Sequence, residues 1–170
     1  MKKFFALGMA AFMIAGSGAA SAAESSDRPA PEEAKKNMEL VRDFLKEAGY
    51  YFLATVDGDQ PRVRPFGTVL IYEGRLYIQT GRKQNVSRQL AKNGKVEICA
   101  YQPQNKRWLR LSGVLVDDDR REPKQAMLDA HPSLKRMYSA DDANTQVLYF
   151  APGATAVIDS FPDTHIVLKF

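Results

Sequence analysis

Residues 62–89 read RVRPFGTVLIYEGRLYIQTGRKQNVSRQ and determine the predicted fold. The segment predicts a strand that carries two arginines, a turn at Glu73-Gly74, and a second strand that ends at Thr80. Gly81-Arg82-Lys83 follows directly and precedes a short predicted helix. Basic side chains beside a helix N-terminus favour an anionic ligand such as a phosphate, because free N–H groups and the helix dipole both attract negative charge.

The two arginines of the predicted strand share a face. Period-2 alternation places Arg62, Arg64 and Phe66 on the same side. A solvated strand face explains this pattern as well as an anion site does, and Arg82-Lys83 taken alone is typical of a basic turn. The predicted hairpin brings the arginines of the strand close to Arg82-Lys83. Both interpretations, an anion site and a solvated surface, therefore remain possible from the sequence.

Short strands and a few helices surround this segment. About six strands are predicted, among them Tyr51–Val56, Arg62–Tyr72, Leu76–Thr80 and Val96–Tyr101. Asp57-Gly58 favours a hairpin after the first of them. Helices are predicted at Glu32–Ala48, at Asn85–Asn93 and from near Arg121 to His131. Hairpin-joined strands without βαβ alternation predict a mainly β fold, a small closed or nearly closed antiparallel barrel with flanking helices.

The first 22 residues are typical of a secretory signal peptide. Met1-Lys2-Lys3 is followed by an apolar stretch from Phe4 to Ile14 and by Ala20-Ser21-Ala22, an A-x-A cleavage motif. An uncleaved anchor is the alternative. The organisation expected is a signal peptide at 1–22, a linker at 23–31 and one domain at 32–170. The protein is then periplasmic or secreted, with no stable membrane anchor after cleavage.

Composition argues against several kinds of site. The formal net charge of +4 falls to +2 without the two lysines of the signal peptide, which is too small to indicate nucleic-acid binding. Cys99 is the single cysteine, so an internal disulfide is excluded, and its place in a strand predicts a buried small hydrophobe. His131 and His165 lie far apart and support no metal site. Asp117–Asp119 precedes a predicted helix and is expected to cap it.

Five motifs follow one another in the chain: FLATVDGDQPRVRPFG, LYIQTGRKQNVSRQL, VEICAY, WLRLSGVLV and MLDAHPSLKRMYSADD. In this order they resemble the small pyridoxamine 5′-phosphate oxidase-like flavoproteins, and the resemblance spans roughly Tyr50 to Phe161. The resemblance implies a six-stranded antiparallel split β-barrel of the FMN-binding type. It also implies a homodimer that binds FMN at the dimer interface. The chain lacks the long C-terminal substrate-binding segment of the vitamin-salvage oxidases, so its substrate is expected to differ.

The resemblance also assigns the cofactor-binding residues. Arg64, Pro65 and Phe66 are expected against the isoalloxazine ring, with Arg62 on the same strand and Thr80 and Gly81 beneath the ring. Arg82, Lys83 and Gln84 are expected to hold the ribityl phosphate. Trp108 and Arg110 are expected to face the cofactor from the neighbouring strand or subunit. Arg64 or Arg110 is the candidate cation for stabilising the reduced, anionic flavin.

Two functions follow as hypotheses. The first is an FMN-dependent oxidoreductase that acts on an unidentified small molecule. The second is a non-catalytic split-barrel protein that binds haem or another ligand, with His165 as the candidate haem ligand. Tyr101, Trp108 and Tyr138 suit a dimer interface, where aromatic residues are enriched, although core packing explains each of them as well.

Overall fold

The computed structural model of the chain describes residues 28–162 and 164–170. The predicted signal peptide and the first five residues of the predicted linker lie outside these ranges. Within them, no helix is both long and apolar enough to span a membrane.

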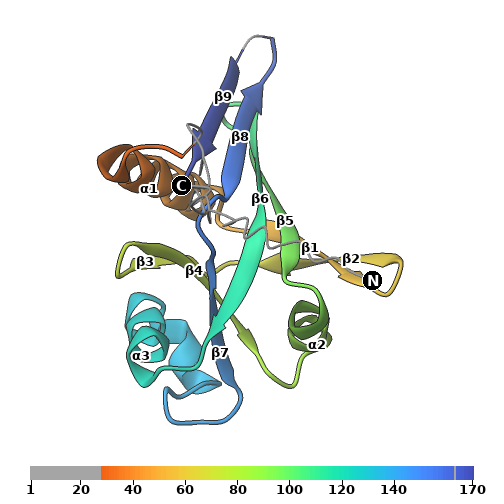
Figure 1. Cartoon of the computed structure of the whole chain (residues 1–170), viewed down its shortest axis with the longest axis vertical. Helices are drawn as coiled ribbons and strands as arrows, with labels where there is room; N and C mark the ends of the chain where they lie inside the picture. The colour runs from red at the N-terminus through yellow and green to blue at the C-terminus, as the bar shows by residue number, and fades with distance from the viewer. Residues whose placement is uncertain (1–27, 163) are drawn as a thin grey trace, which may run out of the picture.

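The described residues form nine strands, three α-helices and one short 3₁₀ helix (Figure 1). In chain order these are α1 (Pro31–Ala48), β1 (Tyr51–Asp57), β2 (Gln60–Phe66), β3 (Leu70–Tyr72), β4 (Arg75–Gly81), α2 (Asn85–Lys92), β5 (Lys95–Gln102), β6 (Arg107–Asp118), α3 (Arg121–Ala130), η1 (Pro132–Arg136), β7 (Thr145–Phe150), β8 (Thr155–Ser160) and β9 (Thr164–Lys169).

Strand β6 holds the two branches of the sheet together. Its first half pairs with β8 and its second half with β7, so the sheet divides along this one strand. The main order is β2-β1-β5-β6-β7-β4-β3, and β9 extends the second branch beyond β8. Every strand pair is antiparallel. In Figure 1 the β8–β9 hairpin reaches one end of the molecule, while β7 and α3 lie at the other. The predicted mainly β, antiparallel split barrel with flanking helices is confirmed.

The single strand predicted at Arg62–Tyr72 is two strands, β2 and β3. This is one reason why the structure has more strands than the six predicted. β2 pairs with β1, whereas β3 leaves that branch and pairs with β4. The crossing segment between them is fixed at Thr68. The hydroxyl of Tyr51 donates to the carbonyl oxygen of Thr68 at 2.7 Å, and the N–H of Gln79 donates to Thr68 Oγ1 at 3.2 Å. These bonds satisfy backbone and side-chain groups that a continuous strand would have paired elsewhere.

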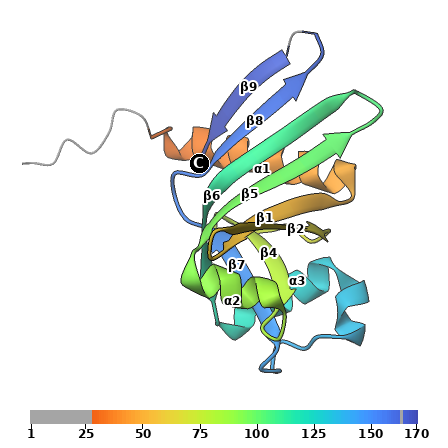
Figure 2. The same ribbon diagram turned by 90° about the vertical axis from the view of Figure 1, so that its right-hand side faces the viewer.

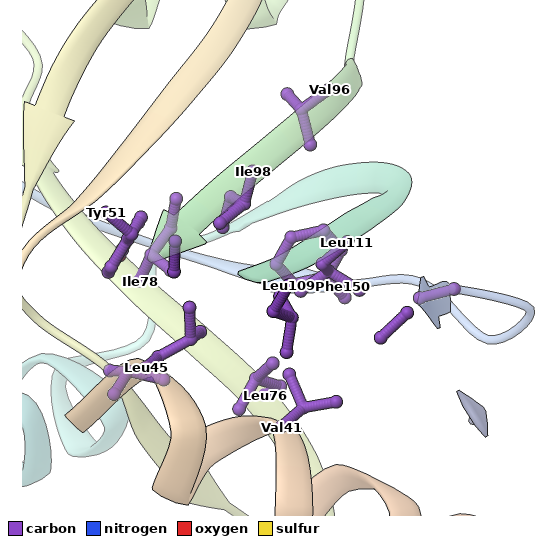
Figure 3. Close-up of a cluster of buried hydrophobic side chains, with 14 of the residues drawn as sticks. Val41, Leu45, Tyr51, Leu76, Ile78, Val96, Ile98, Leu109, Leu111 and Phe150 are labelled. Atoms are coloured by element: carbon purple, nitrogen blue, oxygen red, sulfur yellow. The ribbon is translucent and has the colours of Figure 1, made fainter. Parts of the chain in front are cut away.

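The hydrophobic core lies between the sheet and α1. Strand β5 alternates strictly, with Val96, Ile98 and Ala100 buried. Helix α1 contributes Val41 and Leu45 to the same cluster (Figure 3). Figure 2 shows this helix running behind β5 and β6. Burial of apolar side chains at about 25 cal/mol per Å² is the main force that holds the helix on the sheet.

The prediction that Cys99 is buried is wrong, and the alternation of β5 explains why. The inward positions of this strand are taken by Val96, Ile98 and Ala100, so Cys99 points to the opposite face and is exposed. Partial burial next to Glu97 raises the pKa of its thiol, with burial as the larger cause. A raised pKa leaves little of the nucleophilic thiolate at neutral pH.

Candidate functional site

A pocket of about 780 Å³ opens at the edge of the sheet, where β2, the end of β4, α2 and η1 meet. Seven of the sequence-predicted residues line it: Arg62, Arg64, Pro65, Phe66, Thr80, Lys83 and Gln84. β2 is an edge strand with β1 on one side only. Residues from both of its faces can therefore reach the pocket.

Arg64 is the central cation of this pocket, and neutral groups hold it. Its Nη1 donates to the carbonyl oxygen of Leu53 at 3.1 Å and to Thr55 Oγ1 at 2.7 Å, while Nη2 donates to Gln89 Oε1 at 2.7 Å. Across the described ranges, no carboxylate pairs with its guanidinium. Burial, and then the nearby charge of Arg62, lower the pKa of Arg64. The positive charge therefore stays directed at the pocket.

The start of α2 gives the pocket free N–H groups and a second cation. The N–H of Gln84 donates to Gly81 at 3.0 Å, but the N–H groups of Asn85 and Val86 have no acceptor among the residues described. Such orphan donors at a helix N-terminus suit an anion. Lys83 lies on the same rim, exposed, and its ammonium forms no ion pair within the described part of the chain.

Arg82 does not line the pocket. Its guanidinium lies 2.7 Å from Asp117 and 2.7 Å from Asp119, and the hydrogen bond to Asp117 is the main reason why its pKa is raised. This placement revises the expectation that Arg82 holds a phosphate, because two carboxylates already hold its side chain. Lys83 and Gln84 keep the predicted position on the pocket.

The acidic run Asp117–Asp119 forms ion pairs and does not cap α3 as predicted. The N-cap residue of α3 is Arg120, and no side chain caps it. Asp118 instead binds the guanidinium of Arg120 at 2.8 Å, and Asp119 binds Lys124 at 2.6 Å. Both cations belong to the start of α3, and the backbone N–H of Arg120 also donates to Asp118 Oδ1 at 3.2 Å. No group of three metal-ligating side chains occurs in the described ranges.

Gly81 is required for close packing within the chain. A Cβ at this position would lie 3.1 Å from Asn144 Oδ1 and 3.1 Å from the hydroxyl of Tyr138. Gly81 does not have a positive φ, so the turn requires its small size and not a left-handed conformation. Its small size lets the segment around Asn144 lie against the turn that leads into α2.

Trp108 and Arg110 lie on the outer face of β6, away from the pocket lining of the same chain. The ring of Trp108 lies 5.2 Å from that of Phe161, and Arg110 pairs with Asp159 at 3.4 Å. His165 Nδ1 lies 2.7 Å from the same Asp159. Neither Trp108 nor Arg110 lines the pocket of its own chain.

The outer face that carries these residues is apolar and continues to the pocket. Phe52 pairs with Pro65 on one side and with Cys99 on the other, and Cys99 pairs with Arg110, which places all four on one face. Exposed apolar side chains gather here: Tyr50, Phe52, Val63, Tyr101 and Phe161 are each at least half exposed. Exposed apolar side chains that gather on one face often mark an interface.

Other pocket residues were not predicted. Thr55 and Gln89 hold Arg64, and Leu134, Met137 and Tyr138 line the side formed by η1 and the residues after it. For Tyr138 the sequence suggested only an interface or core role. Alternation along β1 places Thr55 on the inward face with Leu53, where a buried polar residue is a signal in itself. No comparable sequence signal marked the residues of η1 and those after it, because only a long-range contact brings them to the pocket.

Comparison with known proteins identifies the family. A family model described as pyridoxamine 5′-phosphate oxidase matches residues 38–158, well over half of the chain. This chain belongs to the pyridoxamine 5′-phosphate oxidase family. Among solved structures it is similar to a nimC/nimA family protein from Clostridium acetobutylicum, at 43% identity and a TM-score of 0.79, over 82% of this chain and 96% of that one. No curated protein matches the chain.

Two further solved structures share the fold at lower identity. General Stress Protein 26 from Bacillus anthracis has 17% identity and a TM-score of 0.63, over 80% of this chain and 98% of its own. A heme binding protein from Mycobacterium smegmatis has 16% identity and a TM-score of 0.61, over 84% of this chain and 59% of its own. Both likenesses show the fold alone.

The pocket of this family member fits FMN in its chemistry. The cofactor has a phosphate at one end and a flat, polar ring at the other. The N–H groups of Asn85 and Val86, together with Lys83, match the phosphate. Phe66 and Pro65 match the flat ring beside Arg64.

Proposed function

We propose that this chain is an FMN-dependent oxidoreductase that acts on a small molecule and works as an exported homodimer. One observation carries the proposal. The same pocket combines two cations without carboxylate partners in the described residues, Arg64 and Lys83, with two backbone N–H groups that have no acceptor there. A phosphate or another anion in the pocket would give these cations and donors a partner.

The start of α2 is the proposed phosphate end. Lys83 supplies a mobile point charge, and the N–H groups of Asn85 and Val86 supply directed donors. Gln84 lines the same rim and offers a side-chain amide. Charge-assisted hydrogen bonds of this type contribute roughly 1.5–3 kcal/mol each. Arg82 supports this end indirectly by fixing the turn to Asp117 and Asp119.

Strand β2 is the proposed ring end. Pro65 and Phe66 offer flat apolar surface, Thr80 lies beneath, and Arg64 presents its charge to the ring. When bound, FMN supplies the electron transfer chemistry, and the protein supplies orientation and electrostatics. Leu134, Met137 and Tyr138 form the opposite, largely apolar wall, with Met137 70% exposed at the rim. This wall is where a small, partly apolar substrate would meet the cofactor.

A second subunit completes the proposed site. The apolar outer face begins at Val63 and Pro65, which also line the pocket, so a subunit on this face would close the pocket. Trp108 and Arg110 of the partner subunit would then be available to the cofactor. Burying exposed aromatic residues such as Phe52 and Tyr101 would provide much of the driving force.

Haem binding is the second candidate function. The contact of His165 Nδ1 with Asp159 at 2.7 Å favours it, because a carboxylate on one ring nitrogen fixes the other as a ligand. The heme binding relative shares the fold at 16% identity. Against this candidate, His165 is exposed and lies outside the pocket that holds the unpaired cations.

The visible absorption spectrum of the purified protein separates the two candidates. FMN-reconstituted protein should show two flavin bands and retain them after gel filtration, whereas haem reconstitution should give no stable Soret band. Titration with FMN should be saturable at one cofactor per subunit. A stable Soret band with His165 as ligand, lost in His165→Ala, together with no flavin binding, would replace the proposed function by the second candidate.

A further inference from the structure

Arg64 differs from other arginines of this protein in the groups that hold it. The guanidinium groups of Arg82, Arg120 and Arg121 each lie 2.7–2.8 Å from an aspartate carboxylate. Arg64 is held at similar distances, yet its partners are a carbonyl oxygen, a hydroxyl and an amide. A partly buried arginine usually has a carboxylate partner. Arg64 therefore lines the pocket with its guanidinium held by neutral groups.

The neutral partners form a closed ring of hydrogen bonds. Thr55 Oγ1 accepts from Arg64 Nη1 at 2.7 Å and donates to Gln89 Oε1 at 2.7 Å. Gln89 Oε1 also accepts from Arg64 Nη2 at 2.7 Å, so the side-chain oxygen of the amide must face the ring. Thr55 and Gln89 are buried, one on β1 and the other on α2. The guanidinium is therefore held between a strand and a helix before any ligand binds.

We infer that Thr55 and Gln89 are positioning residues, which hold Arg64 as an uncompensated cation directed at a ligand group that carries or gains negative charge. The inference rests on the proposed function where it concerns flavin, since the ring is the part of FMN assigned to Arg64. A fixed guanidinium loses little side-chain entropy on binding. The neutral amide of Gln89 holds the guanidinium of Arg64 in place without cancelling its charge. A glutamate at this position would hold the guanidinium and would also cancel its charge.

The substitution Gln89→Glu tests the charge. It keeps an oxygen acceptor beside Arg64 and adds one negative charge. We expect the midpoint potential of the bound flavin to fall by about 30 mV, which corresponds to tenfold weaker binding of the reduced cofactor relative to the oxidised one. The control Gln60→Glu adds the same charge at the exposed start of β2 and should leave the potential unchanged. An unchanged potential in Gln89→Glu would overturn the inference.

A double-mutant cycle tests whether the effect passes through Arg64. In an Arg64→Met background, Gln89→Glu should no longer lower the potential, because the cation that it would neutralise is gone. Thr55→Val keeps the side-chain shape and removes the hydroxyl, and it should lower the potential in the same direction. An equal effect of Gln89→Glu in both backgrounds would assign it to the general field of the pocket and would contradict the positioning role.

Nuclear magnetic resonance tests the clamp without flavin. In the protein before FMN is added, the side-chain N–H signals of Arg64 should show slow hydrogen exchange, and Thr55→Val should speed that exchange. Arg110 is the internal control, because its one hydrogen bond is 3.4 Å long and its side chain is half exposed. Exchange of Arg64 as fast as that of Arg110 overturns the inference. A clamped Arg64 in a protein that binds no flavin overturns the proposed function and leaves the clamp established.

Discussion

The side-chain oxygen of Asn144 accepts a hydrogen bond from the backbone N–H of Lys83 at 3.1 Å. The carbonyl oxygen of Asn144 also accepts from the N–H of Arg82 at 2.7 Å. The turn before α2 is thus held by the segment that precedes β7, and its own N–H groups are occupied. The donors left for an anion are the N–H groups of Asn85 and Val86 and the ammonium of Lys83.

Lys83→Ala should weaken FMN binding by about tenfold to a hundredfold, the effect of losing one charge-assisted hydrogen bond. Riboflavin, which has no phosphate, should bind the variant and the wild type alike. Arg82→Ala is the matched control, because it removes a neighbouring cation whose partners are Asp117 and Asp119. It should affect FMN binding much less than Lys83→Ala does. Fluorescence titrations with both flavins measure these affinities, and equal losses for FMN and riboflavin would place the phosphate elsewhere.

Local patterns predicted the part of the site that lies on regular elements. Alternation along β2 placed Arg64 and Phe66 together, and the turn chemistry before α2 placed Lys83 at a helix start. The partners of Arg82 could not be predicted, since Asp117 and Asp119 lie at the far end of β6. Adjacent basic residues look equivalent in sequence. Arg82 and Lys83 differ in their roles only because β6, which runs beside β7, brings Asp117 close to the turn before α2.

Asp118 should make stability depend on pH in the acid range. Hydrogen bonds from Arg120, and then from Tyr77 at 2.8 Å, lower its pKa to about 2. In the unfolded chain the carboxyl of Asp118 has an ordinary pKa of about 3.9. Its ionised form therefore stabilises the fold above that pH, and this stabilisation is lost as the pH falls towards 2. Asp118→Asn should cost about 1–2 kcal/mol at neutral pH, since Arg120 is half exposed.

Urea denaturation at neutral pH and near pH 3 checks this dependence. The difference between wild type and Asp118→Asn should shrink as the pH is lowered. Asp129→Asn is the control, because Asp129 pairs with Lys135 at 2.6 Å on an exposed surface, where ion pairs contribute little. A constant difference across this pH range would show that Asp118 contributes through hydrogen bonding that does not require its charge.

Gly81→Ala should disturb the turn before α2 through a steric contact. The new Cβ would meet the side chain of Asn144 and the hydroxyl of Tyr138, both at 3.1 Å. We expect a loss of about 1–3 kcal/mol in the free energy of unfolding and weaker FMN binding. Adding Tyr138→Phe removes the hydroxyl and should restore part of both. Full stability in Gly81→Ala, measured by thermal denaturation, would show that Asn144 and Tyr138 can move aside.

The exported protein should begin at or next to Ala23. The apolar stretch behind Lys2-Lys3 and the Ala20-Ser21-Ala22 motif are the reasons for this expectation. Intact-mass measurement on protein expressed from the full-length sequence gives the result. A mass that still includes residues 1–22 would contradict cleavage, and cell fractionation of the same culture would then show whether the chain is held at a membrane.

Phe52→Glu should disrupt the homodimer that we propose. Phe52 is 52% exposed at the centre of the apolar outer face, with Pro65 of the pocket and Cys99 as its strand neighbours. A buried carboxylate without a partner would oppose association strongly. Leu40→Glu is the control, since Leu40 is 47% exposed but lies on α1. Light scattering at micromolar concentration should give a dimer for the wild type and Leu40→Glu and a monomer for Phe52→Glu. The monomer should also bind FMN more weakly, because it lacks Trp108 and Arg110 of the partner subunit. A wild type that is monomeric while binding FMN fully would show that one chain completes the pocket.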